Sequence, residues 1–259
     1  MLGGGGFSAG KVTEVCGPPG LGKTQIGMQA CVNVQLPEVL GGAGGEALYV
    51  DTEGSFIIER VAEIAAAAER LMATDPRAAD IPPPPVSTLL SRIHILRIHS
   101  PTAQVALTHQ LPSFLSTHRN IKLIIIDSIA FHFRQAFSQA DMPLRARLLN
   151  TTAQTLRRCA EEFTCAVVVM NQMTTKVGGE MGTGEGDAVL VPALGATWGH
   201  ACTNRVILFW DQGVRRACLV KSPSLPERTV GFCITSEGVR DVPPSLPPPD
   251  NPRKRHHDD

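Results

Sequence analysis

Apolar and polar positions follow two patterns along the chain, and each pattern predicts one kind of element. Residues 123–127 and 165–170 are nearly uninterrupted apolar runs, which are typical of strands buried on both faces of a parallel sheet. Residues 143–163 instead carry apolar side chains at three- and four-residue spacing, which predicts an amphipathic helix. The chain therefore alternates between predicted strands and predicted helices.

The same patterns extend over most of the sequence. Strands are predicted at 11–16, 47–51, 93–98, 123–127 and 165–170, and helices at 23–35, 56–72, 102–117 and 143–163. This alternation indicates an α/β fold, with a mostly parallel, twisted sheet and helices on both faces. From about residue 202, three runs separated by short turns predict antiparallel strands at the carboxyl-terminal edge, at 206–210, 216–221 and 229–235.

One domain over residues 1–240 accounts for these elements, and a proline-rich tail over 241–259 is expected to be poorly ordered. The tail contains the basic cluster 252–255, Pro-Arg-Lys-Arg, which is either a nuclear-import signal or a charged, solvated end. The glycine-rich beginning of the sequence looks like a cut through a longer protein.

Composition narrows the functional classes. The 259 residues include 24 Lys and Arg and 24 Asp and Glu, so the formal net charge is zero. A uniformly basic nucleic-acid coat and a polybasic membrane binder are therefore disfavoured, although a local basic strip is still allowed. The seven cysteines are scattered without a C-x-x-C pair, which favours reduced, buried thiols over a zinc site or a disulfide framework. Reduced thiols favour the cytosol or the nucleus. With neither a signal peptide nor an 18-residue apolar stretch, we expect a protein that is neither secreted nor membrane-spanning.

The first motif with chemical content is Gly17-Pro-Pro-Gly-Leu-Gly-Lys-Thr24, which fits the pattern G-x-x-x-x-G-K-[ST]. It lies between a predicted strand and a predicted helix, where backbone N–H groups and the helix amino terminus can bind phosphates. Lys23 would then reach the β- and γ-phosphates, and the Thr24 hydroxyl would coordinate Mg²⁺. The alternative is a glycine-rich turn without a ligand.

Further polar side chains lie at the ends of buried strands. Asp127 ends the most apolar run of the chain, and there a carboxylate can hold Mg²⁺ through water if it faces a cleft. The alternative is that Asp127 or Ser128 caps the following helix. Asn171 and Gln172 follow strand 165–170, where a neutral amide could sense the γ-phosphate and relay its presence to the glycine-rich segment beyond.

Glu53 lies two residues beyond the predicted strand 47–51. Its carboxylate would emerge beside the phosphate loop if that strand neighbours strand 11–16, and it could then deprotonate an attacking water. In a second interpretation, Thr52 or Ser55 caps the next helix and Glu53 only favours its positive end. Both interpretations can hold together.

The order of these motifs resembles the RecA-like strand-exchange recombinases of eukaryotes, and it is closest to their paralogues of the C type. The resemblance runs from about residue 10 to 237, and rests on residues 17–24 (GPPGLGKT), 51–56 (DTEGSF), 123–128 (LIIIDS) and 170–173 (MNQM), with 45–47, 129–134, 191–195, 198–200 and 221–223 matching the paralogue. It implies a RecA-like P-loop ATPase core that binds ATP and Mg²⁺ between subunits. The family's amino-terminal helical domain has no counterpart in this sequence, which predicts weakened self-assembly.

The resemblance also assigns roles to individual residues. Glu53 would activate the water, with Lys23 and Gln172 as the other catalytic residues, and Thr24 and Asp127 would hold the metal. Arg60 would pack on the adenine, and Pro223 would cap the nucleotide of a neighbouring subunit. The nucleotide contacts expected from the loop itself are Gly17, Pro18, Pro19, Gly20, Leu21, Gly22, Lys23, Thr24 and Gln25.

The segments 131–141 and 174–193 would correspond to the family's two DNA-facing loops. Arg134, Lys176, Gly178 and Gly179 are the expected DNA contacts in these segments. Because Asp141, Glu180, Glu185 and Asp187 stand against only two cations there, we expect weak, salt-sensitive DNA binding. The glycines favour a loop that orders on binding DNA or a partner, and a mobile surface loop is the alternative.

The resulting hypothesis is a nuclear homologous-recombination repair factor, with part of the pool in the cytoplasm. It would be a weak DNA-dependent ATPase that acts with other recombinase paralogues, the recombinase filament and single-stranded or branched DNA. One alternative is an adaptor in which nucleotide fixes an interface and turnover is incidental. A P-loop kinase or helicase motor ranks below both, because the sequence has no arginine-rich phosphate lid.

Overall fold

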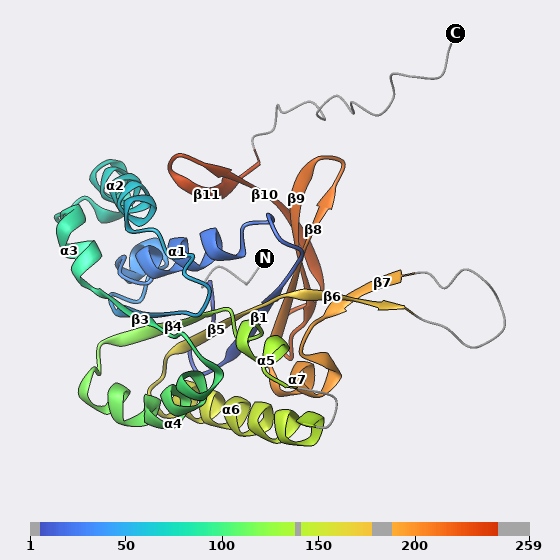
Figure 1. The fold of residues 1–259 in the computed structure, drawn as a ribbon. Helices are drawn as coiled ribbons and strands as arrows, with labels where there is room; N and C mark the ends of the chain where they lie inside the picture. The colour runs from blue at the N-terminus through green and yellow to red at the C-terminus, as the bar shows by residue number, and fades with distance from the viewer. Residues whose placement is uncertain (1–5, 138–140, 178–187, 243–259) are drawn as a thin grey trace, which may run out of the picture.

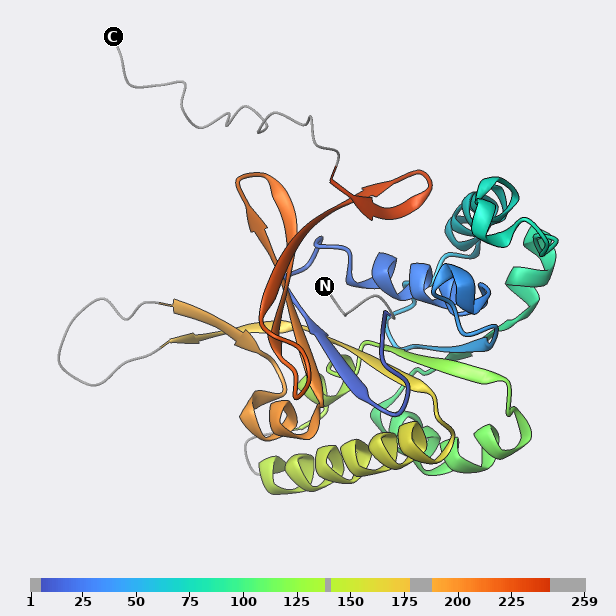
Figure 2. The same cartoon turned by 180° about the vertical axis from the view of Figure 1, so that it is seen from behind.

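The computed structural model describes residues 6–137, 141–177 and 188–242. Its main sheet has nine strands in the order β11-β10-β9-β8-β1-β5-β4-β2-β3 (Figures 1 and 2). These strands are β1 Val12–Cys16, β2 Glu46–Asp51, β3 Ile93–Arg97, β4 Ile121–Asp127, β5 Ala166–Asn171, β8 Asn204–Asp211, β9 Val214–Lys221, β10 Arg228–Thr235 and β11 Gly238–Asp241. The six strands from β3 to β8 in this order are parallel, and β9, β10 and β11 are antiparallel additions at one edge. The predicted fold class is confirmed.

Helices cover both faces of this sheet (Figures 1 and 2). On one face lie α1 Lys23–Asn33, α2 Ile58–Thr74 and α3 Val86–Ser91, and on the other α4 Pro101–Thr117, α5 Phe131–Gln135, α6 Met142–Glu162 and α7 Gly195–Ala201. Short 3₁₀ turns span Glu38–Leu40 and Pro76–Ala78. Alternate residues of the central strands enter two separate hydrophobic cores, which explains why their sequences are apolar at nearly every position. Within the described part of the chain, every helix is too short or too polar to cross a lipid bilayer.

The connection between β5 and β8 contains structure that the sequence patterns did not predict. The strands β6 Met173–Val177 and β7 Ala188–Pro192 pair as an antiparallel hairpin that projects away from the main sheet (Figure 1). The two ends of segment 174–193, for which the sequence indicated a loop, are therefore hydrogen-bonded strands. Gly178 and Gly179 lie outside the described residues, as does the tail beyond residue 242, and the domain boundary at residue 240 stays a prediction.

The parallel register sets the position of the candidate site. Asp51 of β2 pairs with Asp127 of β4, and Met170 of β5 pairs with both Val15 of β1 and Asp127. The carboxyl ends of four strands therefore meet at one edge of the sheet. The cysteine prediction also holds, since six of the seven cysteines are buried and Cys233 is partly exposed.

Candidate functional site: a phosphate-loop cavity

A cavity of about 470 Å³ opens at this carboxyl edge. Its lining brings together residues from distant parts of the sequence, namely Pro19, Gly20, Gly22, Lys23, Thr24, Gln25, Glu53, Asp127, Arg134, Gln172, Met173 and Ile234. A smaller, mainly apolar cavity of about 280 Å³ lies near the opposite edge, beside the starts of β4 and β5, and contains none of the predicted site residues. The chemistry of the described residues therefore converges on the first cavity.

The phosphate loop joins β1 to α1 and enters the helix through Gly22. This residue has a left-handed backbone, with φ 93°, and a Cβ built on it would lie 2.4 Å from Cδ1 of Ile234. The backbone conformation therefore favours glycine, and any side chain here would also force Ile234 to shift. Helix α1 has neither a side-chain cap nor an acidic residue in its first turn, so its amino terminus can accept an anion.

Lys23 folds back over the phosphate loop. Its ammonium group donates hydrogen bonds to the carbonyl oxygens of Gly17 at 2.7 Å and Pro18 at 3.0 Å. Burial lowers the pKa of Lys23 below its ordinary value, although the nearby carboxylates of Asp127 and Glu53 oppose this shift. Because the Lys23 ammonium group is partly buried, its attraction to a bound phosphate group is stronger than it would be in bulk water.

Asp127 and Thr24 form the candidate metal site. The Thr24 hydroxyl donates to Oδ2 of Asp127 at 2.6 Å, and the hydroxyl of Tyr49 donates to the same oxygen at 2.7 Å. Burial raises the pKa of the Asp127 carboxyl, and the two hydroxyl groups only partly offset this. Helix α5 begins four residues later and has Ala130 at its amino-terminal cap, so Asp127 is not a helix cap.

This donor set fits Mg²⁺. A hydroxyl and a carboxylate are hard oxygen ligands, and magnesium is usually held by one or two such groups together with substrate phosphates. Among the described residues, no group of three or more His, Cys, Asp or Glu side chains is placed to hold a metal. The remaining ligands would therefore have to come from a phosphate-bearing molecule and from water.

Glu53 reaches this cavity even though β2 does not neighbour β1. The strands β5 and β4 lie between them. We expected Glu53 beside the phosphate loop only if β1 and β2 were neighbours, and this condition is wrong. The connection is made instead by the side chains of Ser128 and Gln172, which directly follow β4 and β5. Oε1 of Glu53 accepts hydrogen bonds from Ser128 Oγ at 2.5 Å and from Gln172 Nε2 at 2.7 Å.

The backbone around Glu53 is held by Asp51, a residue that the motif analysis did not single out. Its fully buried carboxylate accepts hydrogen bonds from the backbone N–H groups of residues 53–56, at 2.8 to 3.3 Å. It also accepts a hydrogen bond from Nη2 of Arg97 at 3.0 Å. Burial raises the pKa of Asp51, but these hydrogen bonds more than offset it, so the pKa lies below its ordinary value.

The alternative roles of Thr52 and Ser55 as helix caps are wrong, because neither side chain makes a cap hydrogen bond to α2, which has Ile57 at its amino-terminal cap. The Thr52 hydroxyl instead exchanges hydrogen bonds with the backbone of Ser128, at 2.8 and 2.9 Å. Thr52 thereby ties the loop that carries Glu53 to the end of β4.

Arg134 lies at the cavity and donates from Nη1 to Oε1 of Gln172. The three side chains Arg134, Gln172 and Glu53 thus form a hydrogen-bonded series. The sequence interpretation assigned Arg134 to a DNA contact, which stays a prediction. The backbone of Lys176 lies in β6, and its side chain is not described.

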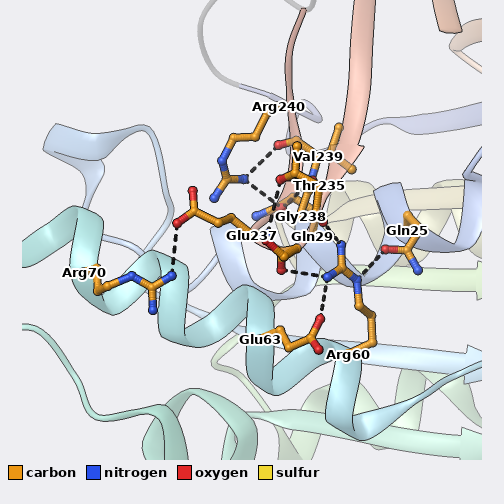
Figure 3. Close-up of polar contacts among 11 residues, drawn as sticks. Gln25, Gln29, Arg60, Glu63, Arg70, Thr235, Glu237, Gly238, Val239 and Arg240 are labelled. Atoms are coloured by element: carbon orange, nitrogen blue, oxygen red, sulfur yellow. Dashed lines mark hydrogen bonds and ion pairs between the residues drawn. The ribbon is translucent and has the colours of Figure 1, made fainter.

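Arg60 lies beside the cavity and joins α2 to the turn between β10 and β11 (Figure 3). Its guanidinium donates to Gln25 Oε1 at 2.8 Å, to Glu63 Oε2 at 2.6 Å and to the backbone oxygens of Thr235 and Ser236. Packing against an adenine stays a prediction. Since Gln25 lines the cavity, however, Arg60 connects the hairpin β10–β11 to the phosphate loop.

Pro223 is exposed in the segment between β9 and β10. Lys221, just before it, pairs with Arg205 near the start of β8, so this segment lies at the edge of the sheet opposite the cavity. Pro223 is therefore far from the phosphate loop of its own chain.

Two partners in this site escaped the sequence analysis for different reasons. Tyr49, the only tyrosine of the chain, contacts Asp127 because β2 and β4 are neighbours, and residue spacing does not reveal strand order. Asp51 had a usable signal, since a carboxylate that ends a buried strand needs partners, but Glu53 two residues later attracted the functional interpretation.

The fold and the cavity define a RecA-like α/β protein with a P-loop and a candidate metal site. A family model described as Rad51 matches residues 1–242, and the chain belongs to the Rad51 family. Members of this family act in homologous recombination and DNA repair.

Individual relatives agree with this placement. The chain is 44% identical over 246 residues to DNA repair protein RAD51 homolog 3 of Cricetulus griseus, covering 92% of this chain and 65% of that protein. It is 42% identical over 252 residues to the protein of the same name from Dictyostelium discoideum, covering 96% and 65%. DNA repair and recombination protein RadA of Metallosphaera sedula is 36% identical over 241 residues, covering 92% and 68%. The chain thus spans about 65% of the length of the two RAD51 homolog 3 proteins.

Proposed function

We propose that this chain is a recombinase paralogue of homologous recombination that binds Mg²⁺-ATP in the carboxyl-edge cavity and hydrolyses it slowly to ADP and phosphate. The observation that carries the proposal is the convergence of Lys23, the Thr24–Asp127 pair and Glu53 on one cavity at the amino terminus of α1. Burying two carboxylates beside a lysine costs free energy, and such clusters are typical of functional sites. A glycine-rich turn without a ligand would not require this arrangement.

Each residue has a distinct task in this proposal. The α1 amino terminus and Lys23 bind the phosphates, after Lys23 exchanges the carbonyl oxygens of Gly17 and Pro18 for phosphate oxygens. Thr24 and Asp127 hold the magnesium ion, which neutralises phosphate charge when bound. Glu53 orients the attacking water and takes its proton, and Ser128 and Gln172 fix the direction of its carboxylate.

The nucleotide would lie between subunits. Pro223 is exposed at the edge of the sheet opposite the cavity, so it can only approach the nucleotide of a second subunit. A head-to-tail arrangement, with the cavity edge of one subunit facing the opposite edge of the next, satisfies this geometry. Arg60 would face the base from its own subunit, since it contacts the cavity residue Gln25.

The partners follow from family membership and from charge. We infer that the chain works with related paralogues, with a recombinase filament and with single-stranded or branched DNA, in the nucleus. RAD51 homolog 3 and RadA relatives carry names in DNA repair and recombination. With zero net charge, the chain should bind DNA weakly by itself and depend on its assembly.

A nucleotide-gated adaptor is the second candidate, and one observation favours it. Oε1 of Glu53 already accepts two hydrogen bonds, from Ser128 and Gln172, and an attacking water would have to compete with them for this oxygen. Nucleotide binding could then serve mainly to fix a subunit interface.

ATP turnover of Glu53→Gln decides between the two. If Glu53 is the base, this variant keeps the ATP affinity of the native chain but loses turnover by about 10² to 10⁴-fold. The matched control is Glu59→Gln, the same substitution at an exposed position in the first turn of α2, which should change neither quantity. Equal, negligible turnover in the native chain and Glu53→Gln, with nucleotide-dependent partner binding intact, would establish the adaptor. Absence of ATP binding to the native chain would contradict both.

A further inference from the structure

Glu14 is a fully buried carboxylate in the middle of the main sheet. It lies on β1, which has β5 on one side and β8 on the other, and it is 0% exposed. A charge in the centre of a parallel sheet costs several kcal/mol unless it is paired and hydrogen-bonded. The phosphate site of the proposed function makes no use of this residue.

Both oxygens of Glu14 have a partner on a neighbouring strand. Oε1 accepts from Nδ2 of Asn171 at 2.7 Å, and Oε2 accepts from Nε of Arg205 at 2.6 Å. Asn171 is the last residue of β5, and Arg205 is the second residue of β8. Glu14 therefore bridges the two strands that flank its own, between the level of Thr13, where β8 begins, and the level of Cys16, where β5 ends.

These two partners mark the ends of one excursion of the chain. Between Asn171 and Arg205 the chain leaves the main sheet to form the hairpin β6–β7 and helix α7, and then returns (Figure 1). The first residue of the excursion is Gln172, whose amide contacts Glu53 in the cavity. Consecutive side chains at the end of β5 thus face different partners, Asn171 toward Glu14 and Gln172 toward the phosphate site.

Helix α7 is fitted to the same cluster. A Cβ built on Gly199 would lie 1.9 Å from Nη2 of Arg205, so a larger residue at this position would force the Arg205 side chain to shift. Lys221 holds the end of the helix by donating from Nζ to the carbonyl oxygens of Gly199, His200 and Cys202. Movement at either end of the excursion would therefore disturb the hydrogen bonds of Glu14.

We propose that Glu14, with Asn171 and Arg205, is a positioning cluster that couples the Gln172 end of the cavity to the hairpin β6–β7 and α7. Glu14 touches neither nucleotide nor DNA in this proposal. It fixes the positions of Asn171 and Arg205 relative to each other, at the two ends of the segment that contains the hairpin and α7. A shift of Gln172 on nucleotide binding would therefore be transmitted to the hairpin and to the helix. The proposal rests on the proposed function, because the signal it transmits is occupancy of the nucleotide cavity.

The test substitution is Glu14→Gln. A glutamine oxygen can still accept from Arg205, but without the negative charge, and its NH₂ group can donate to Oδ1 of Asn171 only after the Asn171 amide turns over. The substitution therefore weakens mainly the β8 side of the cluster. A second variant, Asn171→Ala, cuts the β5 side and leaves the Glu14–Arg205 ion pair in place, so its buried charge stays paired.

Thr13→Val is the matched control. Thr13 is next to Glu14, is equally buried, and accepts a hydrogen bond from Nδ2 of Asn204 at 3.3 Å, between the same two strands β1 and β8. The substitution removes a buried hydrogen bond at nearly constant volume but leaves all contacts of Glu14. A general loss of stability should affect it as it affects the two test variants.

The measurement is amide hydrogen exchange of β6, β7 and α7 in the full chain, with and without magnesium and a non-hydrolysable ATP analogue. In the native chain and in Thr13→Val the analogue should slow exchange in these elements by about 5-fold or more. In Glu14→Gln and Asn171→Ala the analogue should bind with an affinity within about 2-fold of native, but the slowing should be lost.

Retained slowing in Glu14→Gln, or equal loss in Thr13→Val, would overturn the cluster as a coupling device. So would a native chain that binds the analogue without any change in these elements. If the native chain does not bind the analogue, the proposed function fails instead. In that case, amide hydrogen exchange without nucleotide tests the cluster. Equal exchange rates of β6 and α7 in Glu14→Gln and Thr13→Val would then contradict its positioning role.

Discussion

Asp51 and Asp127 end adjacent parallel strands and pair with each other in register, yet their surroundings differ. Asp51 accepts four backbone N–H groups and the guanidinium of Arg97, and its pKa lies below the ordinary value. Asp127 accepts two hydroxyl groups, and burial raises its pKa. The first carboxylate is fully engaged in holding a loop, whereas the second makes no ion pair within the described residues, although the ammonium group of Lys23 lies near it.

The comparison shows that a carboxylate at the carboxyl end of a strand can either stabilise the fold or bind a cation, depending on its surroundings. A carboxylate whose charge is satisfied by the protein contributes to the fold, and its removal leaves buried donors without acceptors. A buried carboxylate that stays short of positive charge costs stability and is suited to bind a cation from outside. We therefore expect Asp127 to act on the proposed magnesium ion and Asp51 to act only through the backbone of Glu53.

The largest effect should come from Asp127→Asn. This substitution removes the charged magnesium ligand, so ATP turnover should fall by about 100-fold or more. Its free energy of unfolding at pH 7 should rise by about 1 kcal/mol, because a desolvated charge is lost. Steady-state phosphate release and urea unfolding of the same preparation check both, and a stable variant with native turnover would contradict the metal role.

Asp51→Asn should lower the stability of the fold, whereas Asp127→Asn should raise it. The asparagine keeps one acceptor oxygen for four N–H groups and loses the charge, so we expect the free energy of unfolding to fall by about 2 to 4 kcal/mol. ATP affinity should stay near native, while turnover falls because the loop that carries Glu53 loosens. Urea unfolding and equilibrium nucleotide titration give the two readings. Native stability in this variant would show that the four N–H bonds contribute little.

The pH dependence of stability should separate the two carboxylates. The lowered pKa of Asp51 gives a stabilisation that is complete above its unfolded value of about 3.9 and is lost as the pH falls through the folded value. The raised pKa of Asp127 has the opposite sign, so its contribution is complete below about 3.9 and is lost as the pH rises through the folded value.

Urea midpoints measured from pH 8 down to pH 4 test this contrast. The native chain should gain stability relative to Asp127→Asn as the pH approaches 4, whereas its advantage over Asp51→Asn should stay constant down to about pH 5 and start to fall only below it. A constant difference for Asp127→Asn would contradict the raised pKa.

The smallest effect should come from Arg97→Ala. The Arg97 side chain is 50% exposed, so solvent screens its ion pair with Asp51. We expect a loss of about 0.5 to 1 kcal/mol in the free energy of unfolding and no change in turnover. A loss comparable to that of Asp51→Asn would mean that the arginine, and not the backbone N–H groups, satisfies the carboxylate.

Much of this arrangement could be predicted from the sequence. The helices and strands of the central α/β unit follow from periodicity, and Lys23, Thr24, Asp127, Glu53 and Gln172 were each expected at the edge where the structure brings them together. The contacts of Tyr49 with Asp127 and of Glu14 with Arg205 could not be predicted, because they depend on which strands are neighbours. Periodicity gives the elements but not their order in the sheet.

Short elements also escaped prediction. Helix α7 has seven residues and β11 has four, which are too few for a periodic pattern to be distinguished from a loop. The strands β6 and β7 pair with each other outside the main sheet. β6 is mostly polar, and the apolar run of β7 is short and follows a glycine-rich stretch of sequence, so the sequence pattern did not distinguish either strand from a loop.

Binding of Mn²⁺, used as a spectroscopic substitute for Mg²⁺, tests the contrast between Asp127 and Asp51 most directly. Electron paramagnetic resonance titrations would compare the native chain, Asp51→Asn and Asp127→Asn with a saturating non-hydrolysable ATP analogue. We predict one Mn²⁺ per chain with equal affinity in the native chain and Asp51→Asn, and an affinity weakened by about 10-fold or more in Asp127→Asn. Equal affinity in all three, or a greater loss in Asp51→Asn, would contradict the assignment of Asp127 as the metal ligand.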